Sequence, residues 1–368
     1  MPIQKVTLKN YKTHRHTEVP LLPLTVLVGP NSVGKTSVLD AIAMVSELAH
    51  PGVLSGPRIE PDLVLRRGEK ALRVSLDLAA PYPGLVEFGI DRTDDGFEAL
   101  CAWERGRRKG SQSAPLPALL PDPDARQLLS AVFGLQGAKR LRLDHEHLAA
   151  PSAIEVGEQT TALSETGHGL AGVLSVAKLF QEPVFDQIVT ELRAVVPSVE
   201  GVRVVRSRFK VQRTDENGVD HSVESDGAEL RIDFVSARDV PARAASEGTL
   251  LALGLLTVVH FFPLPQVVLF DDLERALHPR AQRELVHLLR RTIEHNPGLQ
   301  LVATTHSPYL VDEFSTEEVI VCALRPDGTT AARRLSEHPR AEQAMKLMST
   351  GEFLAATEEQ WVAGEGGG

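Results

Sequence analysis

Residues 29–36 carry glycines, a lysine and a hydroxyl at a spacing that suits phosphate binding. They read Gly-Pro-Asn-Ser-Val-Gly-Lys-Thr and match the P-loop pattern G-x-x-x-x-G-K-[ST] at every fixed position. Glycines let the backbone wrap closely, so that successive N–H groups point at phosphate oxygens. Lys35 can reach β- and γ-phosphates as a mobile charge, and the hydroxyl of Thr36 can hold Mg²⁺. The candidate phosphate-binding residues are Gly29, Pro30, Asn31, Ser32, Val33, Gly34, Lys35, Thr36 and Ser37.

The residues on both sides of this segment predict the elements that must hold it. Residues 24–28 form an apolar run rich in β-formers, which predicts a buried strand. Residues 37–48 carry apolar side chains at helical spacing, which predicts a helix. A helix that begins at Lys35 would turn the positive end of its dipole toward a bound phosphate. This context favours a phosphate site over the alternative, a chance match in an ordinary strand–turn–helix unit.

Two further apolar runs are followed by polar residues in the second half of the chain. Residues 267–270 lead into Asp271 and Asp272, and residues 301–304 are followed closely by His306. Strands separated by helices predict a parallel sheet with ligands at the carboxyl ends of the strands. Asp271 could then hold Mg²⁺, directly or through water, and Asp272 could polarise an attacking water. His306 could contact the γ-phosphate; the alternatives are a structural acid at Asp272 and an ordinary core histidine at His306.

The rest of the chain predicts an α/β fold with a mixed or parallel sheet, an antiparallel β-subdomain and a helical insertion. Residues 71–102 alternate between apolar and polar side chains, which predicts an antiparallel meander. Residues 199–237 return to strands, with a hairpin turn at residues 215–218. The further expected elements are strands at 19–28, 140–143 and 319–324, a surface loop at 104–123, and helices at 163–180, 183–196, 279–293 and 341–357.

Composition and charge narrow the classes of partner. The formal net charge is −10, from 39 Lys and Arg against 49 Asp and Glu, whereas nucleic-acid proteins usually have a basic balance. Aromatic residues make up 5%, which argues against a platform for stacking bases. Any DNA contact must therefore come from a local patch. Alternation could bring several residues of the densest basic strip onto one sheet face, as a DNA or partner surface. The strip is Arg203, Arg206, Arg208, Lys210 and Arg213.

Other kinds of site are not expected. Cys101 and Cys322 lie far apart in sequence and indicate neither a disulfide framework nor a zinc site. Residues 145–147, His-Glu-His, could be taken for metal ligands, but consecutive residues do not share a helix face. No cluster of further ligands accompanies them in the sequence, so a metal site is not expected. No apolar run is long enough to cross a bilayer, and residues 1–20 are polar and mixed in charge. We therefore expect a cytoplasmic protein with no signal peptide and no membrane partner.

Four motifs, in their chain order, resemble the ABC-type ATPases of the RecF, SMC and OLD group. The P-loop comes first, and residues 245–250, Ala-Ser-Glu-Gly-Thr-Leu, are similar to the signature loop of OLD-like members. Residues 267–272 are similar to a Walker B strand, and residues 305–307, Thr-His-Ser, to a switch-histidine loop. The resemblance covers both ends of an ABC ATPase head but not its middle. It implies a P-loop NTPase fold whose cofactors are ATP and Mg²⁺.

The resemblance also implies roles for single residues. Lys35, Asp272 and His306 would be catalytic, and Thr36 and Asp271 would hold the metal. The family usually has Glu where this chain has Asp272. Because Asp is one methylene shorter, hydrolysis is expected to be slow, or to be assisted by Glu274.

The signature loop makes sense only between two copies of the chain. The resemblance implies that it caps the γ-phosphate bound by a second copy, so that two ATP molecules join two copies head to tail. A hydroxyl and free backbone N–H groups at the start of a helix suit such an anion. The alternative for Ser246 is a plain helix N-cap. The loop residues are Ser246, Glu247, Gly248 and Thr249.

The chain also departs from the family pattern. Residues 37–245 show no sustained heptad pattern, so a long-coil SMC head is not expected. No glutamine occurs in residues 37–110, and the Q-loop residue is not placed. Residues 309–368 are too few for the toprim nuclease domain of full OLD proteins. We expect one head over residues 1–368, with an N-terminal lobe at 1–110, a helical insertion at 111–198, a C-terminal lobe at 199–325 and a helical tail at 326–368.

The expected function is that of an ATP-binding and ATP-hydrolysing switch that dimerises on ATP binding, with a higher oligomer left open. In the OLD-like group such ATPases act with a nuclease or toxin in phage defence, so a separate effector chain is expected. The first alternative is a RecF-like, ATP-gated DNA-binding protein of DNA repair. The second, the ATPase subunit of a membrane transporter, ranks lower because the usual L-S-G-G-Q signature is absent.

Overall fold

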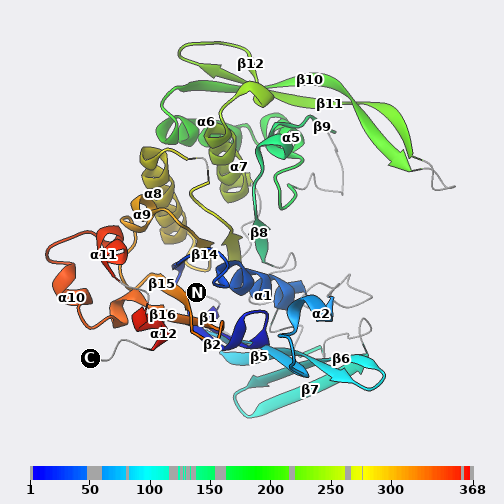
Figure 1. The fold of residues 1–368 in the computed structure, drawn as a ribbon. Helices are drawn as coiled ribbons and strands as arrows, with labels where there is room; N and C mark the ends of the chain where they lie inside the picture. The colour runs from blue at the N-terminus through cyan, green and yellow to red at the C-terminus, as the bar shows by residue number, and fades with distance from the viewer. Residues whose placement is uncertain are drawn as a thin grey trace. The chain divides into compact units, whose positions relative to one another are not determined.

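The structure is a computed structural model in which the chain divides into two compact units. The first unit consists of Met1–Arg140, Pro265–Glu274 and Leu289–Gly368, and the second of Leu141–Leu264 and Arg275–Leu288. Figure 1 shows the helices and strands of both units. The described residues are 3–47, 60–79, 83–115, 123–124, 127, 129, 133, 138–153, 163–214, 220–261, 267–275, 277–357 and 360–364.

The first unit contains a mixed sheet in the order β16-β15-β3-β14-β13-β8. The strands are β16 (Thr330–Arg334), β15 (Val319–Leu324), β3 (Leu24–Val28), β14 (Gln300–Thr304), β13 (Val267–Phe270) and β8 (Lys139–Leu141). β13, β14, β3 and β15 are parallel, and β16 is antiparallel to β15. Every residue of β3, β13 and β14 is buried, as expected for parallel strands covered on both faces. Their carboxyl ends meet at one edge of the sheet.

A second, antiparallel sheet of this unit has the order β2-β1-β4-β5-β6-β7. Its strands are β1 (Ile3–Tyr11), β2 (His14–Pro20), β4 (Ala71–Leu78), β5 (Gly84–Thr93), β6 (Gly96–Arg105) and β7 (Arg108–Pro115). The meander expected over residues 71–102 is therefore confirmed. The alternate apolar residues of its strands share one core with helix α1 (Lys35–Glu47), which contacts both sheets. This packing fixes the helix that follows the P-loop.

Two expected elements of this unit are wrong. The expected strand at 19–28 is two strands in different sheets, because β2 ends at Pro20 and another proline, Pro23, precedes β3. Part of the expected loop at 104–123 is strand β7, which turns back from β6 at Gly106 with φ +60°. Residues 111–115 thus continue a strand and do not begin a helical insertion. Residues 116–122 of that loop lie outside the described part of the chain.

Short helices complete the first unit. They are α2 (Pro61–Val64), α9 (Pro308–Val311), α10 (Ala341–Ala344), α11 (Thr350–Ala356) and α12 (Gln360–Ala363), with a 3₁₀ turn at Leu335–Glu337. The single helix expected at 341–357 is interrupted, because Ser349 starts α11 with a capping box closed by Glu352. Gly351 then packs against α9: a Cβ there would lie 2.3 Å from the carbonyl oxygen of Pro308.

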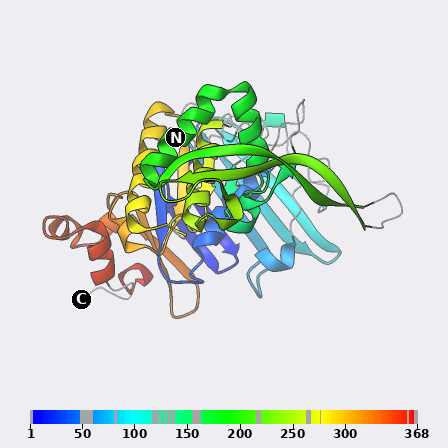
Figure 2. The same cartoon turned by 90° about the horizontal axis from the view of Figure 1, so that it is seen from above.

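The second unit combines helices with a long hairpin. Its elements are α4 (His145–Ala149), β9 (Ser152–Ala153), α5 (Leu170–Phe180), α6 (Glu182–Val195), β10 (Val199–Thr214), β11 (Asp220–Phe234), β12 (Val240–Pro241), the 3₁₀ turn Ala242–Ala244, α7 (Glu247–Phe261) and the first part of α8 (Pro279–His295). The helix expected at 163–180 begins only at Leu170, because Gly167 and Gly169 adopt left-handed φ values of +95° and +99°. Figure 2 shows β10 and β11 as a long twisted ribbon that extends beyond the helices of its own unit. The turn expected at 215–218 lies outside the described residues.

Candidate nucleotide site

The P-loop connects β3 to α1 at the carboxyl edge of the parallel sheet, as the sequence predicts. Gly29 and Gly34 have φ values of +138° and +97°, which side-chain-bearing residues rarely adopt. A Cβ at Gly29 would lie 2.1 Å from the carbonyl oxygen of Cys322, and one at Gly34 would lie 2.7 Å from Nε2 of His14. Both glycines are therefore required by backbone conformation and by space.

Lys35 is held close to the loop that it serves. Its Nζ donates hydrogen bonds to the carbonyl oxygens of Gly29, at 2.8 Å, and of Pro30, at 2.7 Å. Burial lowers the pKa of Lys35, although nearby acids act in the opposite direction. Two of the three N–H donors of the Lys35 ammonium are thus bound to neutral carbonyl oxygens. A phosphate oxygen could replace either carbonyl oxygen as the acceptor.

The two expected metal-binding residues meet. Thr36 Oγ1 donates a 2.9 Å hydrogen bond to Oδ1 of Asp271, although 235 positions separate them in sequence. Thr304 Oγ1, at the end of β14, donates to the same oxygen at 2.9 Å. A hydroxyl and a buried carboxylate are hard oxygen ligands, which suit Mg²⁺ when phosphate and water complete the shell. The donor set therefore fits the expected ion.

The residues after β13 and β14 lie near this carboxylate. Asp272 has a left-handed φ of +56°, and its backbone N–H donates to Oγ1 of Thr304 at 2.8 Å. Glu274 Oε1 accepts a 2.6 Å hydrogen bond from the backbone N–H of His306, whose side chain is exposed. Glu274 therefore ties the histidine loop to the segment that carries Asp271. The catalytic roles of Asp272 and His306 stay predictions.

Sequence reasoning missed the residues that support the P-loop from behind. His14 Nε2 lies 3.1 Å from the carbonyl oxygen of Gly34. Thr330 Oγ1, at the start of β16, lies 2.9 Å from the carbonyl oxygen of Val33 and 2.7 Å from Oγ1 of Thr13. Burial lowers the pKa of His14 to about 4, so the ring stays neutral at pH 7. The sequence around His14 is polar and basic, but no local pattern marks Thr330.

Arg140 on β8 was also missed. Its Nη1 lies 2.6 Å from Oδ1 of Asp40, one turn along α1 from the P-loop. Its Nη2 lies 3.7 Å from Oδ2 of Asp271, and Lys12 Nζ lies 2.5 Å from Oδ2 of Asp40. Charged side chains from α1, β8 and the segment after β1 thus gather beside the expected metal ligand. A basic residue in a short predicted strand was the only signal in the sequence.

The signature residues belong to the second unit and begin α7. Ser246 Oγ lies 2.7 Å from Oγ1 of Thr249 and accepts from its backbone N–H at 3.2 Å, so Ser246 is an N-cap. Glu247 is paired with Arg275 at 3.3 Å. Ser246 is nevertheless exposed, and Gly248, two residues after the cap, is half-buried. A cap and a contact to a second copy are compatible, and the second role stays a prediction.

Only part of the basic strip shares one face of β10. Along β10, Arg203 points to the opposite face from Arg206 and Arg208, because side chains alternate. Arg203 is paired with Asp233 and Asp239, and Arg208 with Asp226. The side chains of Lys210 and Arg213 lie outside the described set. The described part of the strip therefore offers less free positive charge than its sequence suggests.

Other possible sites carry little chemistry. In the described part of the chain, no group of three or more His, Cys, Asp and Glu residues could bind a metal, and His145 Nε2 instead lies 3.1 Å from the carbonyl oxygen of Ala245. None of the helices in the described ranges is both long and apolar enough to span a membrane.

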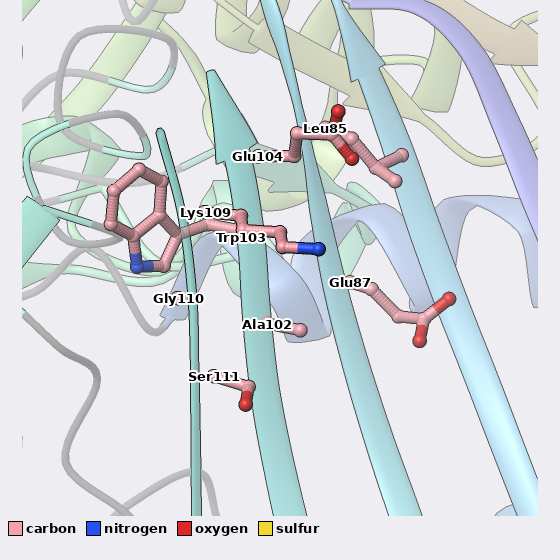
Figure 3. Close-up of a pocket in the computed structure, with 8 residues that line it drawn as sticks. All are labelled: Leu85, Glu87, Ala102, Trp103, Glu104, Lys109, Gly110 and Ser111. Carbon is pink, nitrogen blue, oxygen red and sulfur yellow. The ribbon is translucent and has the colours of Figure 1, made fainter. Parts of the chain in front are cut away.

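Figure 3 shows an open hollow of about 500 Å³ on the β5–β7 part of the antiparallel sheet. Its residues are Leu85, Glu87, Ala102, Trp103, Glu104, Lys109, Gly110 and Ser111. Lys109 reaches across the strands, and Glu87 accepts a hydrogen bond from Ser75 at 2.8 Å. Opposite charges therefore share this surface, which is typical of the solvated face of an antiparallel sheet.

Two family models match segments of this chain that carry the motifs. The family described as "AAA ATPase domain" matches residues 1–63, which include the P-loop. The family described as "AAA domain, putative AbiEii toxin, Type IV TA system" matches residues 181–312, which include the signature loop, Asp271 and His306. The two matches thus cover the same ends of the head that carry the motifs.

Two curated relatives match short segments. The chain is 32% identical over 69 residues to the Septu protein PtuA of Bacillus thuringiensis, and 32% identical over 80 residues to the OLD nuclease of Thermus scotoductus. These segments are 19% and 22% of this chain, and only 17% and 15% of the two relatives.

Solved structures share the fold over nearly the whole chain. The SMC head bound to the C-winged helix domain of ScpA has a TM-score of 0.54 at 16% identity, over 94% of this chain and 99% of that one. The Pyrococcus furiosus SMC head domain with an extended coiled coil has a TM-score of 0.55 at 13% identity, over 94% of this chain and 100% of that one. These likenesses confirm the expected α/β head fold. The chain is therefore similar to ATPase domains over these two segments, and its fold is that of SMC heads.

Proposed function

We propose that this protein binds ATP with Mg²⁺ at the P-loop and hydrolyses it to ADP and phosphate. The main support is the hydrogen bond between Thr36 and Asp271, beside Lys35 and at the carboxyl ends of parallel strands. This is the position at which P-loop proteins hold the metal and the β- and γ-phosphates. The family likeness supports the same chemistry at the level of the group.

Each group has a separate role in this proposal. Lys35 leaves its two carbonyl partners for the phosphates, and Thr36 and Asp271 hold Mg²⁺, which neutralises charge on the transferred phosphate. Asp272 orients and deprotonates the attacking water. Glu274, through its bond to the backbone of His306, fixes the loop that senses the γ-phosphate.

The proposed output is a change in association. ATP joins two copies head to tail, with Ser246 of one copy against the γ-phosphate of the other, and hydrolysis releases them. The cycle then controls a separate effector chain, with antiphage defence as the biological setting. The support is the likeness to PtuA and the OLD nuclease and to a family described by a toxin, over short segments.

Two substitutions test the chemistry in one experiment. Lys35→Ala should lose binding of a fluorescent ATP analogue, and Asp272→Asn should bind it normally but lose phosphate release by about 100-fold or more. Lys346→Ala, which removes an exposed lysine, should leave both measurements unchanged. Normal turnover by Asp272→Asn would move the role of base to Glu274, and normal binding by Lys35→Ala would contradict the proposed nucleotide site.

A further inference from the structure

The buried carboxylate of Asp271 has two different sides in this structure. Oδ1 accepts both hydroxyl hydrogen bonds, from Thr36 and from Thr304. Oδ2 instead faces the guanidinium of Arg140, at 3.7 Å. Because the side chain of Asp271 is only 4% exposed, its negative charge needs a nearby cation when no metal is bound.

Arg140 has a second acid to which it can turn. Its Nη1 lies 2.6 Å from Asp40, so the guanidinium lies between two carboxylates. Asp40 also holds Lys12, and it projects from α1, the helix that carries Thr36. A small rotation of Arg140 could therefore break its contact with Asp271 and keep its contact with Asp40.

A guanidinium and Mg²⁺ beside the same carboxylate of Asp271 would repel each other strongly, because both are cations. We propose that Arg140 is the counter-ion of Asp271 in the nucleotide-free protein, and that Mg–nucleotide displaces it toward Asp40. This inference rests on the proposed nucleotide site. Arg140 is then a positioning residue that keeps Asp271 ionised and ordered in the nucleotide-free protein. It also raises the Mg²⁺ concentration needed for binding, because its contact with Asp271 must break before Mg–nucleotide can bind.

The coupling between Arg140 and Asp271 can be measured without nucleotide. Arg140→Gln, Asp271→Asn and the double variant are unfolded by heat in EDTA. Arg140→Gln should lower the midpoint by at least about 2 °C in the wild-type background. In the Asp271→Asn background the decrease should be clearly smaller, because the neutral amide no longer needs a cation. Equal decreases in both backgrounds would overturn the inference.

The Mg²⁺ dependence of nucleotide binding gives a second test, in which Arg140→Gln should improve binding although it lowers stability in EDTA. With a non-hydrolysable ATP analogue held constant, the Mg²⁺ concentration for half-maximal thermal stabilisation should fall about fivefold or more in Arg140→Gln. Arg140→Lys keeps a charge and should change less, and Arg142→Gln, an exposed neighbour, should match the wild type. A higher Mg²⁺ requirement in Arg140→Gln would overturn the inference and make Arg140 a ligand-binding residue. If the wild-type protein shows no Mg–nucleotide stabilisation, the proposed function fails instead.

Discussion

His14 is a fully buried residue that contacts the P-loop. Its Nε2 lies 3.1 Å from the carbonyl oxygen of Gly34, and burial, assisted by the charge of Lys12, lowers its pKa from 6.5 to about 4. Below pH 6.5 the unfolded chain therefore takes up a proton that the folded chain does not. The contribution of His14 to the unfolding free energy is therefore fully present above pH 6.5 and is lost as the pH falls toward 4.

This residue predicts a measurable pH dependence of stability. Between pH 7 and pH 5, His14 should cost the folded protein about 2 kcal/mol of unfolding free energy. His14→Gln can still donate to the carbonyl group of Gly34 but does not titrate, so its stability should fall less over that range in urea unfolding. His16→Gln is the control, because His16 is exposed on the same strand. The same loss of stability in His14→Gln as in the wild type would contradict this account.

Between elements, one buried side chain joins the two sheets of the first unit. Gln300 begins β14, and its amide oxygen accepts from the backbone N–H of Ile3 in β1, at 3.1 Å. Its amide nitrogen donates to the carbonyl oxygens of Ile3, at 2.8 Å, and of Leu22, at 3.0 Å. One side chain therefore binds both the start of β1 and the segment before β3 to the parallel sheet.

Loss of this link should destabilise the fold. Gln300→Ala leaves the buried N–H of Ile3 without its side-chain partner and opens a small cavity, at a cost of about 3 kcal/mol. Urea unfolding at pH 7 measures it. Gln343→Ala on the exposed face of α10 should change stability by less than about 0.5 kcal/mol. A Gln300→Ala change as small as that of the control would mean that water or a shifted chain replaces the amide.

Predictions from sequence succeeded where the signal is local. The apolar runs of β3, β13 and β14, and the P-loop between β3 and α1, follow from neighbouring residues alone. The boundary at 19–28 failed because both halves are apolar, and only tertiary pairing assigns them to separate sheets. Arg140, His14 and Thr330 could not be found for the same reason: each acts on residues from other strands, through the register of the fold.

At the scale of the whole molecule, the proposed switch depends on Ser246. This residue caps its own helix, α7, so a substitution to Ala would weaken the helix as well as any contact to a second copy. Asp and Asn are equally good N-caps and therefore separate the two roles. Only Asp adds a negative charge, which would face the γ-phosphate of the partner copy.

We therefore predict that Ser246→Asp folds normally and binds the ATP analogue with near wild-type affinity, but does not dimerise. The measurement is sedimentation velocity in the Asp272→Asn background, where ATP is not consumed and the ATP-bound dimer should accumulate. Ser246→Asn in the same background should still form the dimer, because it keeps the cap without the charge. Repulsion between a carboxylate and a triphosphate weakens with salt, so high ionic strength should partly restore the dimer of Ser246→Asp. Dimers of equal stability in both variants would place the signature loop away from the nucleotide, and the head-to-tail arrangement would then be wrong.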